Sequence, residues 1–224
     1  MTVNRRYSWC VIRGAVVYFV RGIYQYARAF AVMQLLIIGL VIFLGVHSVR
    51  IFANDWRRRQ IGRLGEGRWK GLFSLVSFAG LILIIFGFGA ARIYPVLLYA
   101  PPAWLRHVNI FLTLAAFILV AAAYVPGNHF KGKIGHPMLA GVTIGAFGHL
   151  LAVGMLRDAV LFGAFLIWSI IDFAASRRRD RIAGVVYPAG SVQGDLLAIA
   201  IGAVVWAAFA FWLHMRLIGV NPLV

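Results

Sequence analysis

The chain has 224 residues, of which 62% are hydrophobic and only 6 are acidic, and its formal net charge is +16. A soluble domain holds roughly 45–50% apolar residues even when glycine is counted. This composition therefore excludes an ordinary soluble globular protein, a disordered chain and a disulfide-built scaffold. Cys10 is the only cysteine, which excludes an internal disulfide and a cysteine-built metal site.

Residues 1–32 carry five arginines between apolar runs that are too short to span a membrane. Two interpretations fit this region. It is either an arginine-rich amphipathic arm on an anionic lipid surface, or a basic extension that precedes a true start at Met33. The positive-inside rule favours the second interpretation. We therefore separate residues 1–32 from a transmembrane domain at residues 33–224.

Six apolar segments bounded by charged residues follow along the chain, and their length predicts membrane-spanning helices. The fold class is therefore expected to be an all-α, polytopic transmembrane bundle of about six spans. The segment that contains Thr143, His149 and several glycines is the weakest, and the Gly141 and Gly145 spacing indicates close helix packing there. The six segments are Gln34–Ala53, Gly71–Ala91, His107–Val125, Met138–Leu156, Ala159–Ser176 and Leu196–Met215.

The basic residues gather in alternate loops of this six-span pattern. Twelve of them lie in three loops, at 54–70, 131–133 and 177–181, and a minority lie on the other side. By the positive-inside rule the three loops are cytoplasmic, which predicts a multi-pass protein of the bacterial inner membrane. The charge is therefore explained by a lipid bilayer, and no nucleic acid partner is expected. A membrane or respiratory protein partner stays open.

Ionisable groups inside apolar spans are costly there and are the main candidates for function. His47 lies within the first span and His149 within the fourth. A neutral imidazole inside a bundle needs hydrogen-bond partners, so one interpretation is purely structural. The other is ligation of a metal or haem iron.

Spacing limits which histidines can share one iron. His136 and His149 are 13 residues apart, about 20 Å along a straight helix, and cannot be its two ligands. His47 and His149 differ in depth by roughly 8 Å when counted from the cytoplasmic boundary, which tilt and side-chain reach can absorb. His107 and His149 are an alternative pair toward the outer face.

Other polar residues have simpler interpretations. Asp172 precedes basic residues by about one helical turn and is expected to interact with an arginine. His107 and His214 lie beside tryptophans at span ends and are expected to be interface anchors. His129 is expected to be solvated in its loop. The loop at residues 62–67 is rich in glycine and surrounded by basic residues; it is either a flexible turn or an anionic-headgroup site.

Four stretches resemble the NnrU family of bacterial membrane proteins, and the likeness covers about residues 33–180. The stretches are GVHSVRIFA at 45–53, RLGEGRWKGLFSLVSFAGL at 63–81, PPAWLRH at 101–107 and HPMLAGVTIGAFGHLLAVG at 136–154. Members of this family characteristically begin just before the first helix, which again favours Met33. The family name implies an association with nitric oxide and denitrification, without a defined reaction.

The related 15-cis-zeta-carotene isomerases bind haem b, and the resemblance implies ligands for it. A histidine in a His-Ser pair on an early helix corresponds to His47. A histidine thirteen residues after a His-Pro pair corresponds to His149, with His107 and His136 as weaker candidates. The isomerases carry a cysteine three residues before the later histidine, where this chain has Ala146. The resemblance therefore implies a haem-associated accessory or redox role, with a polyene isomerase or a protein with structural histidines as alternatives.

Overall fold

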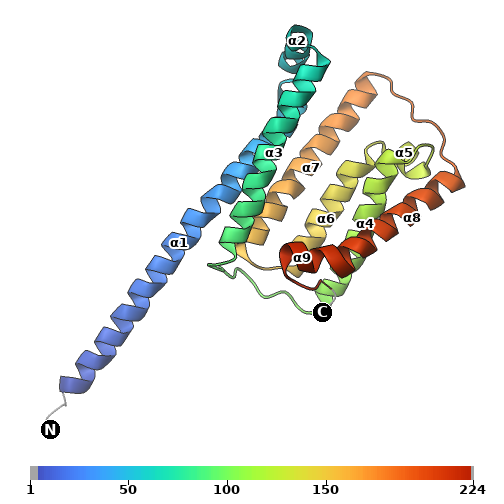
Figure 1. Cartoon of the computed structure of the whole chain (residues 1–224). Helices are drawn as coiled ribbons and strands as arrows, with labels where there is room; N and C mark the ends of the chain where they lie inside the picture. The colour runs from blue at the N-terminus through green and yellow to red at the C-terminus, as the bar shows by residue number, and fades with distance from the viewer. Residues whose placement is uncertain (1–4, 223–224) are drawn as a thin grey trace.

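A computed structural model describes residues 5–222 of the chain, which form a bundle of helices (Figure 1). The fold is all-α, as predicted, and the described residues contain no strand beyond one isolated bridge between Leu97 and Met155. The helices are α1 (Arg5–Phe52), α2 (Asn54–Leu64), α3 (Glu66–Ala91), α4 (Trp104–Tyr124), α5 (His129–Ile134), α6 (Pro137–Ala152), α7 (Leu156–Ile182), α8 (Val192–Ala208) and α9 (His214–Ile218). A π-helical segment, Phe209–Leu213, joins α8 to α9.

Five of the described helices are long and apolar enough to cross a membrane, so the chain is a multi-pass membrane protein. They are Phe30–Phe52 within α1, Glu66–Ala91, Trp104–Tyr124, Leu156–Ile182 and Val192–Ile218. The remaining predicted span, the fourth along the chain, is α6, which has 16 residues and measures about 24 Å, somewhat less than the ~30 Å of a hydrocarbon core. The weakest predicted segment is thus the shortest helix of the six.

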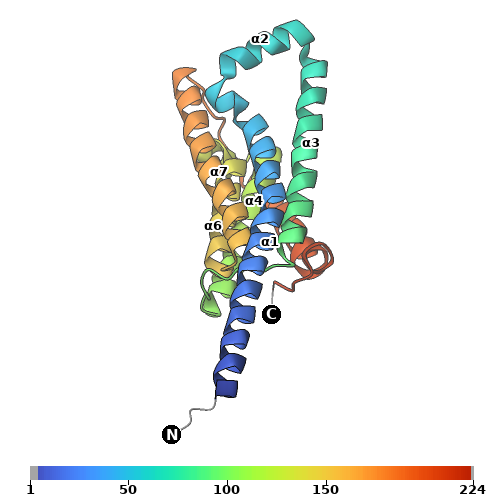
Figure 2. The ribbon, with the colours of Figure 1, turned by 90° about the vertical axis from the view of Figure 1, so that its left-hand side faces the viewer.

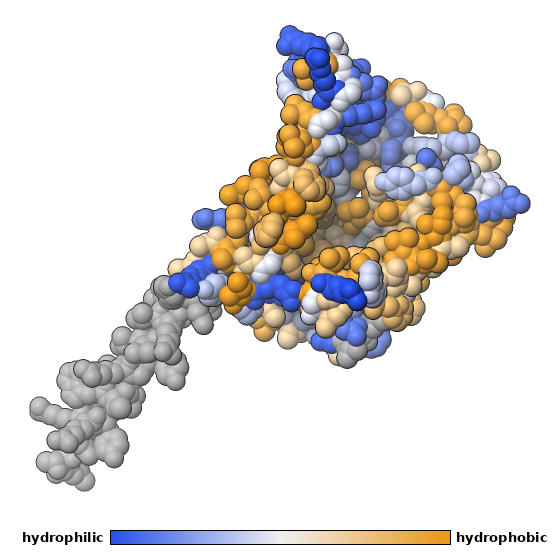
Figure 3. Space-filling view, in the orientation of Figure 1, coloured by the Kyte–Doolittle hydropathy of each residue, from blue (hydrophilic) through white to orange (hydrophobic). Residues whose placement is uncertain are grey.

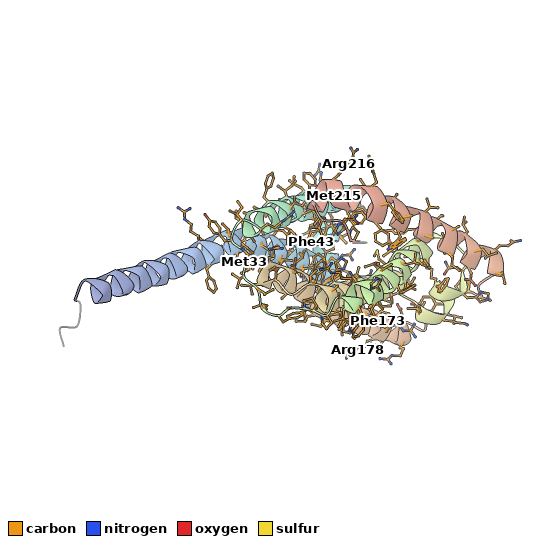
Figure 4. All side chains as sticks on the ribbon, turned by 90° about the horizontal axis from the view of Figure 1, so that it is seen from below. Met33, Phe43, Phe173, Arg178, Met215 and Arg216 are labelled. Carbon is orange, nitrogen blue, oxygen red and sulfur yellow. The ribbon has the colours of Figure 1, made fainter. Side chains whose placement is uncertain are left out.

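The helices form one curved row in which each packs on the next, in the order α3, α1, α7, α6, α4, α8. Seen from below, the row curves so that Met215 and Arg216, after α8, lie across the bundle from Phe173 and Arg178 on α7 (Figure 4). The helix α2, helix α5 and the connection between α7 and α8 lie at one end of the bundle (Figure 1). We call this the basic end, because the three arginine- and lysine-rich segments at 54–70, 131–133 and 177–181 lie there. The sequence predicts these segments as loops, and they are largely helical, in α2, α3, α5 and the end of α7.

Contact between α1 and α3 depends on glycines. A Cβ atom added to Gly87 would lie 2.3 Å from the backbone nitrogen of Leu36, and one added to Gly80 would lie 2.8 Å from that of Phe43. The two backbones therefore approach closely, and Leu36 is fully buried between them. Residues of α7 such as Leu156 and Val160 pack against the same cluster.

Helix α1 continues without a break through residues 5–32 and extends away from the bundle (Figure 2). The interpretation of this region as an extension before Met33 stays a prediction. Within the bundle, the outer surface of α1 and α3 is mostly hydrophobic, whereas α2 above it is hydrophilic (Figure 3). This is the pattern of spans that face lipid, with a polar helix at the membrane surface.

Candidate functional site

His47 lies on α1, five residues before the helix ends at the basic end. Its Nδ1 is 2.6 Å from the carbonyl oxygen of Phe43, one turn earlier. Three aromatic rings surround the imidazole, at centroid distances of 4.3 Å for Phe43, 5.0 Å for Phe73 and 6.0 Å for Trp168. His47 is half-buried and lines a cavity of about 450 Å³ between α1, α2 and α3, which we call the α1–α3 cavity.

His149 lies near the end of α6 that is remote from the basic end. Its Nδ1 is 2.8 Å from the carbonyl oxygen of Gly145, again one turn earlier. The ring stacks on Phe162 of α7, with centroids 4.2 Å apart and planes inclined by 20°. His149 lines a second cavity, of about 270 Å³, between α4, α6 and the α8–α9 segment, which we call the α4–α8 cavity.

The hydrogen bond at Nδ1 has a chemical consequence for both histidines. A ring nitrogen that faces a carbonyl oxygen must carry the proton, because the carbonyl only accepts. The proton is then absent from Nε2 in the neutral ring, and its lone pair is left for a ligand. Imidazoles that bind metal ions are commonly oriented in this way. No hydrogen bond to Nε2 of either residue occurs among residues 5–222.

The structure places His47 and His149 in two different cavities. Their partners on α7, Trp168 and Phe162, are six residues apart, which corresponds to about 9 Å along that helix. Helix α7 packs on both α1 and α6, and the two imidazoles contact it from those two helices. Their pairing on one iron therefore stays a prediction, since it requires both rings to reach a common point.

His214 is the second imidazole of the α4–α8 cavity. It follows the π-helical segment, and Phe209 and Ala210 of that segment line the same cavity. Its Nδ1 is 2.6 Å from the carbonyl oxygen of Val220, so in the neutral ring the lone pair lies on Nε2, as in His149. Sequence reasoning assigned His214 only to the membrane interface, because the turn that directs it inward cannot be read from the local pattern. Extra-wide turns of this kind are frequent at functional sites.

Polar groups from α4 complete the α4–α8 cavity. Arg106, Asn109 and Thr113 line it, and Thr113 accepts a hydrogen bond from the indole nitrogen of Trp206 at 3.1 Å. The remaining lining is largely apolar and aromatic, including Phe117. No aspartate or glutamate is among the lining residues that the structure describes.

The other two candidate histidines lie elsewhere. His107 is an exposed residue in the first turn of α4 and does not line the α4–α8 cavity, so the structure does not bring it to His149. His136 precedes α6 at the basic end, and its Nε2 is 2.6 Å from Asp180. Tyr187 donates a hydrogen bond to the same carboxylate. This cluster joins the start of α6 to the end of α7.

His129 is solvated, with 42% of its side chain exposed, and the structure adds an acidic partner that the sequence does not indicate. Its Nδ1 is 2.7 Å from one carboxylate oxygen of Asp195, and its backbone nitrogen donates to the other oxygen at 2.7 Å. Asp195 lies 66 residues away, at the start of α8, so no local pattern could reveal the pair. Asp172 interacts with an arginine as expected, at 3.6 Å, and the partner is Arg179.

Comparison with known proteins identifies the family. The family model described as NnrU protein matches residues 35–222. The chain belongs to the NnrU family. The match covers all six apolar helices of the bundle and extends beyond the four stretches that indicated the resemblance. No curated protein and no solved structure matches the chain.

Proposed function

We propose that this NnrU-family protein binds haem b in the bacterial inner membrane and has an accessory or redox role in nitric oxide or denitrification metabolism. The observation that supports haem binding most strongly is the state of His149. Its Nδ1 is held by the carbonyl oxygen of Gly145, and its Nε2 has no partner among the described residues, at a cavity that also holds His214. When bound, haem supplies a redox-active iron.

The lining of the α4–α8 cavity favours haem over a bare metal ion. No aspartate or glutamate is among the described lining residues, so a divalent cation there would have no acidic ligand. Iron in a porphyrin already has four ring nitrogens as ligands, and the porphyrin brings its own carboxylates.

Two histidines compete as the second ligand beside His149. The family resemblance favours His47, in the α1–α3 cavity, and the observed geometry favours His214, in the same cavity as His149. His47 contacts α7 from α1 and His149 contacts it from α6, at points about 9 Å apart along α7. His149 and His214 line one cavity from α6 and α9.

The test is an absorption spectrum of the detergent-purified protein, oxidised and reduced, after expression with adequate haem supply. A Soret band is expected, and His149→Ala is expected to shift or remove it. Of His47→Ala and His214→Ala, the variant that changes the band identifies the second ligand. His107→Ala is the matched control, because this exposed histidine lies outside the cavity. A protein without a Soret band would contradict the proposal.

The alternative function is a haem-dependent cis–trans isomerase of a polyene. Ala146, which is 5% exposed within α6, stands where the isomerases carry a cysteine, so a ligand switch at that position has no thiol to use. Conversion of a supplied cis-polyene by the purified protein would favour the isomerase. Loss of nitric oxide consumption in membranes from cells that lack the gene, restored by wild type and not by His149→Ala, would favour the denitrification role.

A further inference from the structure

The α1–α3 cavity lies at the basic end of the bundle, where α2 crosses between the ends of α1 and α3 (Figure 2). Its polar lining comes from all three helices. Arg50 lies in the last turn of α1, Arg57 on α2, and Lys70 and Ser74 in the first turns of α3.

The cations of this cavity outnumber its anions. Arg50, Arg57 and Lys70 line it, and Glu66 is the only acidic residue among the described lining. The Glu66 carboxylate is 2.8 Å from the ammonium of Lys70, so one cation is already paired. Arg50 and Arg57 have no ion pair within 4 Å among residues 5–222. The excess of positive charge among these lining residues favours an anion in the cavity.

Aromatic residues place the cavity at the level of the membrane surface. Trp69, which lines the cavity, is buried and makes an edge-on contact with Trp56 of α2, with ring centroids 5.8 Å apart. Tryptophans concentrate at the boundary between lipid headgroups and hydrocarbon. Helix α2 is polar and has no buried residue, as expected for a helix that lies on the membrane surface.

An exposed apolar stripe on α3 leads away from the cavity toward the membrane interior. It consists of Phe78, Leu81 and Ile85, which follow Ser74 at intervals of four, three and four residues and so lie on the same helix face. Their exposed fractions are 61%, 39% and 57%. The stripe is about 16 Å long from Ser74 to Ile85, enough to contact much of one acyl chain.

We propose that the α1–α3 cavity binds the headgroup of an anionic phospholipid, whose acyl chain lies along the α3 stripe. Arg50 and Arg57 contact the phosphate, Ser74 donates a hydrogen bond to it, and Trp69 packs against the glycerol region. The site is separate from the α4–α8 cavity and does not depend on haem. The apolar stripe is what distinguishes a lipid from free phosphate as the occupant.

The test uses the full chain in detergent, with native mass spectrometry to count bound phosphatidylglycerol against phosphatidylcholine at equal concentration. Wild type is expected to retain phosphatidylglycerol selectively. The double variant Arg50→Ala/Arg57→Ala is expected to bind it on the order of 30-fold more weakly, because each basic residue near a membrane surface contributes about a factor of five. Arg63→Ala/Arg68→Ala is the matched control, since it removes two exposed charges of the same segment that do not line the cavity.

A second variant tests the acyl-chain stripe. Phe78→Asn/Leu81→Asn leaves all cavity charges in place and is expected to weaken phosphatidylglycerol binding. A soluble headgroup analogue, glycerol phosphate, is expected to bind wild type and all variants equally poorly. If the cavity double variant and the Arg63→Ala/Arg68→Ala control lost phosphatidylglycerol binding equally, the proposal would be overturned, because the lipid would then be attracted by surface charge in general. Displacement of the lipid by millimolar inorganic phosphate would assign a phosphate site instead. Loss of haem in Arg50→Ala/Arg57→Ala would assign these side chains to haem carboxylates and also overturn it.

Discussion

At the scale of single residues, the ring nitrogens of histidine divide the functional candidates from the structural ones. His47, His149 and His214 each place Nδ1 against a backbone carbonyl oxygen, which leaves Nε2 with its lone pair. His129 and His136 instead contact carboxylates, and both lie at the basic end. A histidine bound to a carboxylate joins helices, whereas one with an open Nε2 can accept a ligand.

The cluster of His136, Asp180 and Tyr187 makes a prediction about stability. Burial, and then the hydrogen bond to Asp180, raise the pKa of Tyr187 above its ordinary value, so the hydroxyl stays protonated and donates. Asp180→Asn removes the charged acceptor that two side chains share, and it is expected to lower the thermal midpoint by a few degrees. Asp55→Asn, which breaks an exposed pair with Arg58, is the control and is expected to leave the midpoint unchanged. Equal midpoints for both variants would contradict this role.

Sequence reasoning recovered the intramembrane histidines and missed their surroundings for a physical reason. An ionisable residue within an apolar run can be recognised from the local sequence alone, and His47 and His149 are such residues. The partners of His129 and His136 lie 66 and 44 residues away, and only the folded bundle brings them together. The sequence predicts an interface position for His214 because it lies beside Trp212 at a span end, and the π-helical segment before it leaves no pattern in the sequence.

At the scale of helices, close backbone contacts set the spacing of α1 and α3. Gly87→Ala would push its new methyl group into the backbone of Leu36, at 2.3 Å, and neither backbone is free to move without separating the helices. We expect a loss of about 1–3 kcal/mol in stability, the usual cost of overpacking. Gly89→Ala is the control, two residues along the same helix, where no atom lies within 4 Å. The midpoint of denaturation of the two purified variants tests this; a smaller loss for Gly87 than for Gly89 would refute it.

Helix α6 shows that the sequence predicts the number of spans more accurately than the residues at which each helix ends. Six apolar segments were visible, and six apolar helices occupy them, although α6 reaches only 16 residues. The predicted span extends to Leu156, whereas α6 ends at Ala152, because Val153 takes an extended conformation. The next residue, Gly154, lies so close to the carbonyl oxygen of Tyr99 that a Cβ atom there would clash with it. This contact comes from a distant loop. The Gly141 and Gly145 spacing was read correctly as a packing site, since both glycines meet Ala116 of α4.

At the scale of the whole molecule, the basic loops gather at one end, and the two cavities lie toward opposite ends. Helices α1 and α7 run toward the basic end and α3 and α6 run away from it (Figure 1). This is the alternation that a six-span chain requires. This topology could be predicted from the sequence, because the positive-inside rule uses only the positions of Lys and Arg along the chain.

Cysteine labelling tests the orientation of the molecule. In a Cys10→Ser background, Arg63→Cys and Ala189→Cys at the basic end are expected to react with a membrane-impermeant maleimide only in inverted vesicles. Ala100→Cys, in the exposed loop at the other end, is expected to react in intact cells. Labelling of Arg63→Cys in intact cells would reverse the orientation and place the α1–α3 cavity on the outer surface.

The reduced-minus-oxidised absorption spectrum of the purified protein, recorded for wild type and His149→Ala side by side, tests the central claim most directly. If haem binds through His149, wild type shows a Soret band and sharp visible bands on reduction, and His149→Ala loses or shifts them while it remains folded by circular dichroism. A haem-replete wild type without these bands, or a His149→Ala spectrum identical to that of wild type, would contradict the assignment of His149 as a haem ligand.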